Sequence, residues 1–130
     1  MNSIDFIKKQ MLLGDISFLE NMNSIDIDYF VQIFYGIEKE EKNKLLSLCF
    51  DSLTLYFPTI AFRLVFFLEE YVSFCKEFLE KDCSIFANYR IFNDFLGSTQ
   101  WSVTYVSQHL DDILIYEDNI FICLQYAIYK

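Results

Sequence analysis

The fold depends first on residues 58–80, which read PTIAFRLVFFLEEYVSFCKEFLE. Pro58 suits the first position of a helix, because the N–H group that proline lacks would have no partner there. The first half of the segment is apolar almost throughout and is interrupted only by Arg63. A helix that is apolar on all sides is normally surrounded by other elements. We therefore predict one helix over about residues 59–80 that lies at the centre of the fold.

The remaining helices are marked by a small number of breakers. The chain has only three glycines, at positions 14, 36 and 97, and each follows a periodic apolar segment, as a helix C-terminal glycine does. Ser3 is a candidate cap for the first helix. Apolar side chains recur at three- and four-residue steps between these points. The expected helices cover about residues 4–13, 24 or 26 to 35, 38–56, 82 or 84 to 96, and 98 or 99 onward.

The C-terminal residues 113–129 fit two structures. Ile113–Tyr116 and Ile120–Cys123 are apolar runs separated by three polar residues, a pattern typical of a β-hairpin. Asp118 can also cap a helix, with apolar residues after it at helical spacing. We favour a helix in this segment, with a C-terminal β-hairpin as the alternative. For the whole chain we predict an all-α fold, a compact bundle of six or seven helices that forms a single domain over residues 1–130.

Composition indicates a soluble, ordered protein. The chain has 130 residues, of which 54% are hydrophobic, so it has enough apolar surface for a core. Residues 1–13 contain Asp5, Lys8 and Lys9, which leaves no apolar core for an export signal. No apolar run reaches the ~20 residues needed to span a bilayer. We expect a cytoplasmic protein with no membrane partner.

Four cysteines stand at positions 49, 75, 83 and 123, and the only histidine is His109. Zinc ligands come at short, paired spacings, which these positions lack. Because each cysteine has apolar neighbours, we expect free buried thiols, with a disulfide as the alternative in an oxidising compartment. We predict no metal site and no cofactor.

No constellation of residues predicts catalysis. His109 lies near Asp111 and Asp112, but residues two and three apart on a helix do not all converge. Three isolated glycines cannot form a phosphate-binding loop. A serine or cysteine nucleophile would have no base other than His109. We therefore expect that the protein is not an enzyme.

Charge is unevenly distributed along the chain. There are 19 acidic and 10 basic side chains, for a formal net charge of −9. The segments 10–38 and 91–129 each hold acidic residues and no Lys or Arg. No basic excess exists to neutralise phosphates, so direct nucleic-acid binding is not expected. The two segments instead favour docking on a basic protein, although an acidic surface that serves solubility alone would show the same charge.

Tyrosines beside carboxylates refine this prediction. Asp28-Tyr29 and Tyr116-Glu117 combine an aromatic ring with a negative charge, which suits an interface that binds Arg or Lys. The candidate partner-binding residues are Asp26, Asp28, Tyr29, Asp94, Asp111, Asp112, Tyr116, Glu117 and Asp118.

In its overall profile the chain resembles the immunity proteins of bacterial toxin systems. These include the immunity proteins of contact-dependent growth inhibition and the small helical immunity proteins of nuclease colicins. The resemblance lies in size, acidity, expected helical content, and a composition rich in Ile, Phe, Tyr and Asn and poor in Ala, Gly and Pro. It implies a cytoplasmic protein, monomeric before binding, that neutralises a cognate toxin domain by covering its basic active-site surface.

Two other classes remain open. An acidic secretion chaperone would bind an extended effector segment through a strand surface, which the C-terminal hairpin would favour. A viral helical-bundle regulator of apoptosis or signalling would need an exposed apolar groove, with the phenylalanine-rich residues 57–78 as its central helix.

Overall fold

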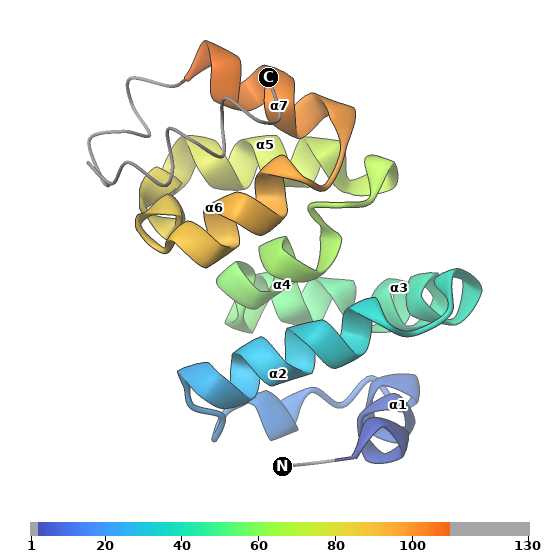
Figure 1. Ribbon diagram of the computed structural model, residues 1–130. Helices are drawn as coiled ribbons and strands as arrows, with labels where there is room; N and C mark the ends of the chain where they lie inside the picture. The colour runs from blue at the N-terminus through green and yellow to red at the C-terminus, as the bar shows by residue number, and fades with distance from the viewer. Residues whose placement is uncertain (1–2, 110–130) are drawn as a thin grey trace. The chain divides into compact units, whose positions relative to one another are not determined.

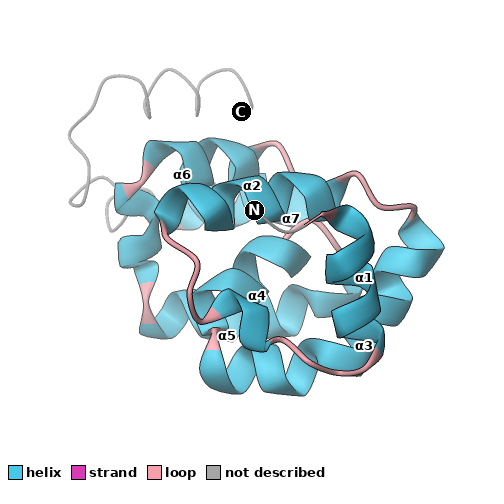
Figure 2. Cartoon of the chain, turned by 90° about the horizontal axis from the view of Figure 1, so that it is seen from below, coloured by secondary structure: helices cyan, strands magenta, loops and turns pink. Residues whose placement is uncertain are grey.

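The structure is a computed structural model that describes residues 3–109, apart from the side chains of Cys83, Tyr89 and Gln100. This part of the chain contains seven α-helices and three short 3₁₀ helices and no strand (Figures 1 and 2). The predicted all-α class is confirmed. None of the helices described is both long enough and apolar enough to cross a membrane. Residues 113–129, where the sequence allows a helix or a hairpin, lie outside the described residues.

The chain divides into two compact units, residues 1–64 and residues 65–130. The single domain over residues 1–130 stays a prediction. The first unit contains α1 (Ile4–Leu12), the 3₁₀ helix η1 (Ser17–Leu19), α2 (Ser24–Tyr35), α3 (Lys39–Tyr56) and α4 (Pro58–Val65), which ends at the boundary. The second contains the 3₁₀ helix η2 (Glu69–Tyr71), α5 (Val72–Lys81), the 3₁₀ helix η3 (Cys83–Ala87), α6 (Tyr89–Leu96) and α7 (Gln100–Gln108).

The ends of α1 are fixed by the residues that the sequence singles out. The Ser3 hydroxyl accepts a hydrogen bond from the Phe6 N–H at 3.2 Å, which satisfies one of the free donors of the first turn. Gly14 follows the helix with a φ of 74°, and its N–H donates to the Met11 carbonyl at 3.0 Å. Glycine adopts this left-handed conformation without a steric penalty, so both predicted boundaries are confirmed.

The other helices of the first unit begin and end close to their predicted residues. Asn23 caps α2 by accepting a hydrogen bond from the Asp26 N–H at 2.8 Å, so the helix begins at Ser24. Gly36 follows its last residue. Pro58 is the first residue of α4, as its fixed φ favours.

A core of aromatic and aliphatic side chains holds the first unit together. α1 packs on α3, and the Cys49 thiol on α3 donates a hydrogen bond to the Met11 carbonyl on α1 at 3.1 Å. The Phe18 and Phe30 rings meet edge to face with their centres 5.7 Å apart. The residues fully buried within this unit include Ile7, Met11, Phe30, Phe34, Leu45, Leu46, Cys49, Leu53, Ala61, Phe62 and Leu64.

The prediction of one helix over residues 59–80 is wrong. α4 ends at Val65, Leu68 is extended, and the chain continues through η2 into α5. In a continuous helix each residue advances by about 100° around the axis, so two steps amount to about 200°. Residues 66 and 68 would then lie about 160° apart, on nearly opposite sides of the helix. The break instead allows Phe66 and Leu68 both to be buried, and Phe66 packs on Phe95 with ring centres 5.8 Å apart. The residues 57–78 are therefore not the single central helix that a helical-bundle regulator would need.

The second unit has an aromatic core on α6. Phe95 lies within 5.0 to 6.2 Å, between ring centres, of Phe86, Trp101 and Tyr105. The helix expected from residue 82 or 84 begins instead at Tyr89, because the Asn88 side chain accepts hydrogen bonds from two N–H groups of the first turn. The preceding residues form η3.

Two of the four cysteines are free and buried, as predicted. Burial raises the pKa of the Cys75 thiol to about 12, and it also raises the pKa of Cys49, with a further contribution from the nearby charge of Asp15. Cys123 and the side chain of Cys83 lie outside the described part of the structure.

Candidate partner-binding surface

The outward side of α2 carries apolar and acidic residues together. Phe30, Val31 and Phe34 are buried on the inward side of the helix. Residues three and four apart share a side of a helix, so Ile25, Tyr29 and Gln32 lie together on the opposite side. Ile25 is 78% exposed and Tyr29 is 52% exposed. Together with the carboxylates Asp26 and Asp28, these three residues are called the α2 surface below.

Asp26 lies in the first turn of α2, where a negative charge is stabilised by the helix dipole. No Lys or Arg among the described residues forms an ion pair with it. Asp26 is partly exposed and lies one turn before Tyr29. Asp26 and Tyr29 are therefore adjacent and accessible on α2, and their role in partner binding stays a prediction.

Asp28 has a different environment. Its carboxylate lies 2.8 Å from the guanidinium of Arg63, and the exposed fractions of the two side chains are 33% and 11%. The Tyr35 hydroxyl donates a hydrogen bond to the carbonyl of the same arginine at 2.6 Å. The charge of Asp28 is thus compensated within the first unit, and the residue connects α2 to α4.

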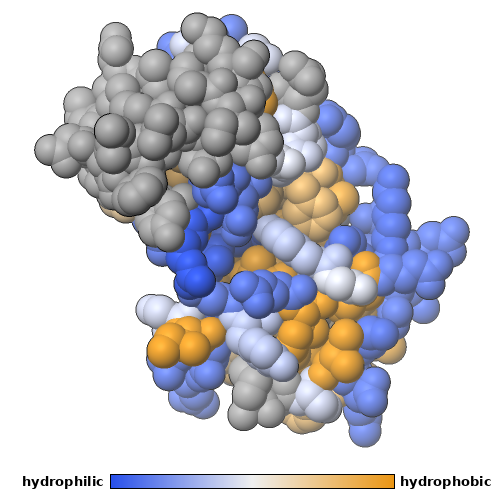
Figure 3. Space-filling model, viewed as in Figure 1, coloured by the Kyte–Doolittle hydropathy of each residue, from blue (hydrophilic) through white to orange (hydrophobic). Residues whose placement is uncertain are grey.

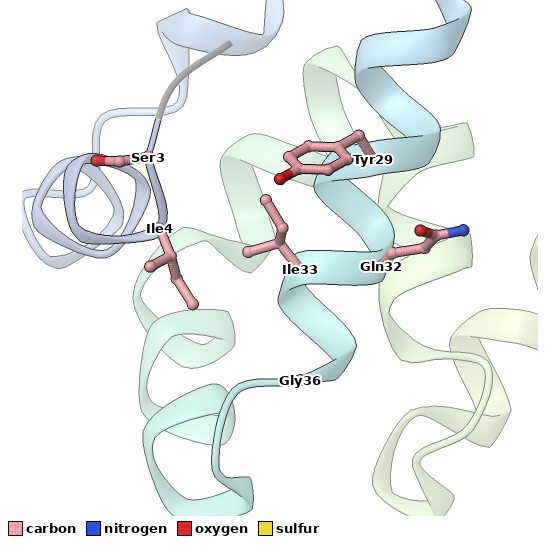
Figure 4. Close-up of a pocket in the computed structure, with 6 residues that line it drawn as sticks. All are labelled: Ser3, Ile4, Tyr29, Gln32, Ile33 and Gly36. Atoms are coloured by element: carbon pink, nitrogen blue, oxygen red, sulfur yellow. The ribbon is translucent and has the colours of Figure 1, made fainter.

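A groove opens between the start of α1 and α2. It has a volume of about 310 Å³ and is lined by Ser3, Ile4, Tyr29, Gln32, Ile33 and Gly36. In Figure 4 the Ile33 side chain points toward the Tyr29 ring, Ile4 approaches from α1, and the Gln32 amide points away. Figure 3 shows an orange apolar patch over α1 and α2, where these helices lie in Figure 1. We call this feature the α1–α2 groove.

Sequence reasoning missed Ile4, Ile25 and Ile33. A signal for Ile25 and Ile33 was present, because residues 24–35 carry large apolar side chains on both sides of the helix. An amphipathic helix needs only one apolar side for its core. The second apolar side therefore indicates a surface that the core does not use.

Several cations of the first unit are held by internal acceptors. Lys8 pairs with Glu41 at 3.2 Å, and Arg63 pairs with Asp28. The Lys42 ammonium is buried and donates to the Tyr35 carbonyl at 3.3 Å, and its burial lowers its pKa. These contacts reduce the positive charge that the unit presents to a partner.

The other predicted partner-binding residues are not brought to this surface by the described structure. Asp94 is exposed on α6 and belongs to the second unit. The remaining five lie outside the described residues: Asp111, Asp112, Tyr116, Glu117 and Asp118.

His109 forms only a local contact in the described structure. Its ring stacks on that of Tyr105, with centres 4.2 Å apart, and its Nδ1 lies 2.9 Å from the Tyr105 carbonyl. Among residues 3–109, no three side chains of His, Cys, Asp or Glu gather into a group that could hold a metal ion.

No family model, curated protein or solved structure matches this chain.

Proposed function

We propose that the protein is a toxin-neutralising binding protein of the cytoplasm, which acts by association and not by catalysis. Its partner is a basic toxin domain, and a nuclease fits best because a nuclease cleft must be positively charged to bind phosphate. The protein, a monomer before binding, covers that cleft with carboxylates and tyrosines. The α2 surface makes the first contact.

One observation carries the proposal: Tyr29 is 52% exposed and lies one turn from Asp26, whose charge no described cation compensates. A tyrosine ring offers a large contact area and a face for a cation, and a carboxylate beside it pairs with the same cation. Tyrosines are frequent among the residues that dominate binding energy at interfaces. This combination therefore suits the capture of an Arg or Lys side chain.

The net charge of −9 supports the same partner class. Opposite charges on two proteins accelerate their encounter, and added salt screens this effect over about 8 to 10 Å. Asp94, on the second unit, and the four acidic residues beyond residue 109 add to the negative charge without being assigned to the contact.

The experiment begins with the protein encoded by the open reading frame immediately upstream. Its C-terminal domain is produced alone and together with this chain. We expect the domain to be toxic alone, to be neutralised by the full chain, and to bind it with an association rate that falls steeply with salt. Asp26→Asn should weaken the complex, whereas Asp51→Asn, the same change at an exposed position of α3, should leave it intact. A domain that is not neutralised, or an association rate that salt does not change, would contradict the proposal.

A further inference from the structure

The α1–α2 groove is an apolar recess of the first unit. Ile4 from α1 and Ile33 from α2 line the groove, and the Tyr29 ring forms a third wall (Figure 4). Ile4 is 37% exposed, so part of its side chain is in contact with solvent. Filling the groove would remove this apolar area from water, which is favourable.

Carboxylates lie beside the groove in the chain. Asp5 follows Ile4, Asp26 lies one turn before Tyr29, and Glu38 lies two residues after Gly36. No ion pair with a described residue compensates any of the three. The nearest exposed cations in sequence are Lys9, four residues after Asp5, and Lys39, directly after Glu38, so the three carboxylates outnumber them by one.

The size of the groove limits its occupant. Its volume of about 310 Å³ is at the lower end of the range for sites that enclose a drug-sized molecule. It suits one or two apolar side chains that project from a protein chain. The carboxylates then select for a chain whose neighbouring residues are Lys or Arg.

We propose that the α1–α2 groove receives a large apolar side chain from a basic segment of the partner, whose flanking Lys and Arg residues pair with Asp5, Asp26 and Glu38. The inference rests on the proposed function and makes it more specific, because it names the sequence chemistry of the partner segment. The apolar side chain is the anchor, and the charges set its orientation.

Two capped hexapeptides test the inference with the full-length chain. Both carry two lysines at each end, and the central pair is leucine in one and glycine in the other. We expect the leucine peptide to bind about tenfold more tightly, since burial of one leucine side chain accounts for that factor. In methyl-labelled protein its binding should shift the NMR signals of Ile4 and Ile33.

Variants locate the effect. Ile33→Gln should reduce the affinity for the leucine peptide to that for the glycine peptide. Ile4→Gln should act in the same direction, and it replaces the first variant in the test if Ile33→Gln does not fold. Leu55→Gln makes a similar change at a 70% exposed position of α3 and should keep the leucine preference. Thermal unfolding of each variant establishes that it is folded.

The outcomes separate this inference from the proposed function. A leucine preference that is absent, or that survives both groove variants, overturns the inference. Equal, salt-sensitive binding of both peptides also overturns it, while docking of a basic partner on the acidic surface stands. A leucine preference that Ile33→Gln removes supports the groove even where the upstream domain fails to bind, and in that case only the proposed function is wrong.

Discussion

The Asp28 carboxylate on α2 lies 2.8 Å from the Arg63 guanidinium on α4, and this ion pair connects two helices of the first unit. Arg63 is the more buried partner, and its own carbonyl accepts the Tyr35 hydroxyl. One arginine thus binds α2 through both its side chain and its backbone. The contact assigns Asp28 to stability, although its position in the sequence suggests a surface role.

Replacing this carboxylate should destabilise the protein. Asp28→Asn leaves the Arg63 charge without its partner, and we expect the free energy of unfolding to fall by about 1–3 kcal/mol. Asp26→Asn removes only a charge at the helix N-terminus and should cost less than about 1 kcal/mol. Urea titrations of both variants provide the comparison. Equal losses would show that the Arg63 contact adds nothing to stability.

Two glycines should respond in opposite directions to the same substitution. Gly14 has a φ of 74°, so Gly14→Ala forces a left-handed alanine and should cost about 1 kcal/mol. Gly36 has a φ of −78°, and an added Cβ would lie in ordinary contact, 3.4 Å from the Ile33 carbonyl oxygen. Gly36→Ala should therefore stabilise the protein by about 0.4–1 kcal/mol. Melting temperatures that move in the same direction for both variants would contradict this assignment.

These boundaries also show how far local sequence determines the fold. The cap at Ser3, the glycines and Pro58 act on the residues next to them, so the sequence was sufficient to place the helix ends there. The break after Val65 depends on the packing of Phe66 against Phe95, a contact between residues far apart in the chain. Such tertiary contacts override local helix preference, and periodicity cannot reveal them.

The same distinction applies to the candidate site. Asp26 and Tyr29 were predictable as candidates, because residues 10–38 hold acidic side chains and no Lys or Arg, and because Tyr29 directly follows Asp28. The α1–α2 groove was not, because Ile4 joins Ile33 only when α1 and α2 are placed together. The partner of Asp28 was hidden for the same reason.

The buried Cys75 thiol should make stability depend on alkaline pH. Its pKa is about 12 in the folded protein, compared with an ordinary value of 9.0. The folded state therefore holds the proton more tightly, and the resulting stabilisation is complete below pH 9 and is lost as the pH rises toward 12. Denaturant titrations between these limits should show a smaller loss in Cys75→Ala than in the natural chain. Identical pH profiles would show that this thiol does not contribute.

The two exposed tyrosines of the first unit offer a matched test of the α2 surface. Tyr29 and Tyr56 are 52% and 69% exposed, so neither substitution to alanine should lower the free energy of unfolding by more than about 1 kcal/mol. Tyr29→Ala should weaken the complex with the basic toxin domain by about 2 kcal/mol, roughly 30-fold, as for a residue at the centre of an interface. Tyr56→Ala, at the end of α3, should leave the affinity unchanged. Calorimetric titration measures the affinity of each variant for the toxin domain. If Tyr56→Ala weakens binding as much as Tyr29→Ala does, the α2 surface is not the interface.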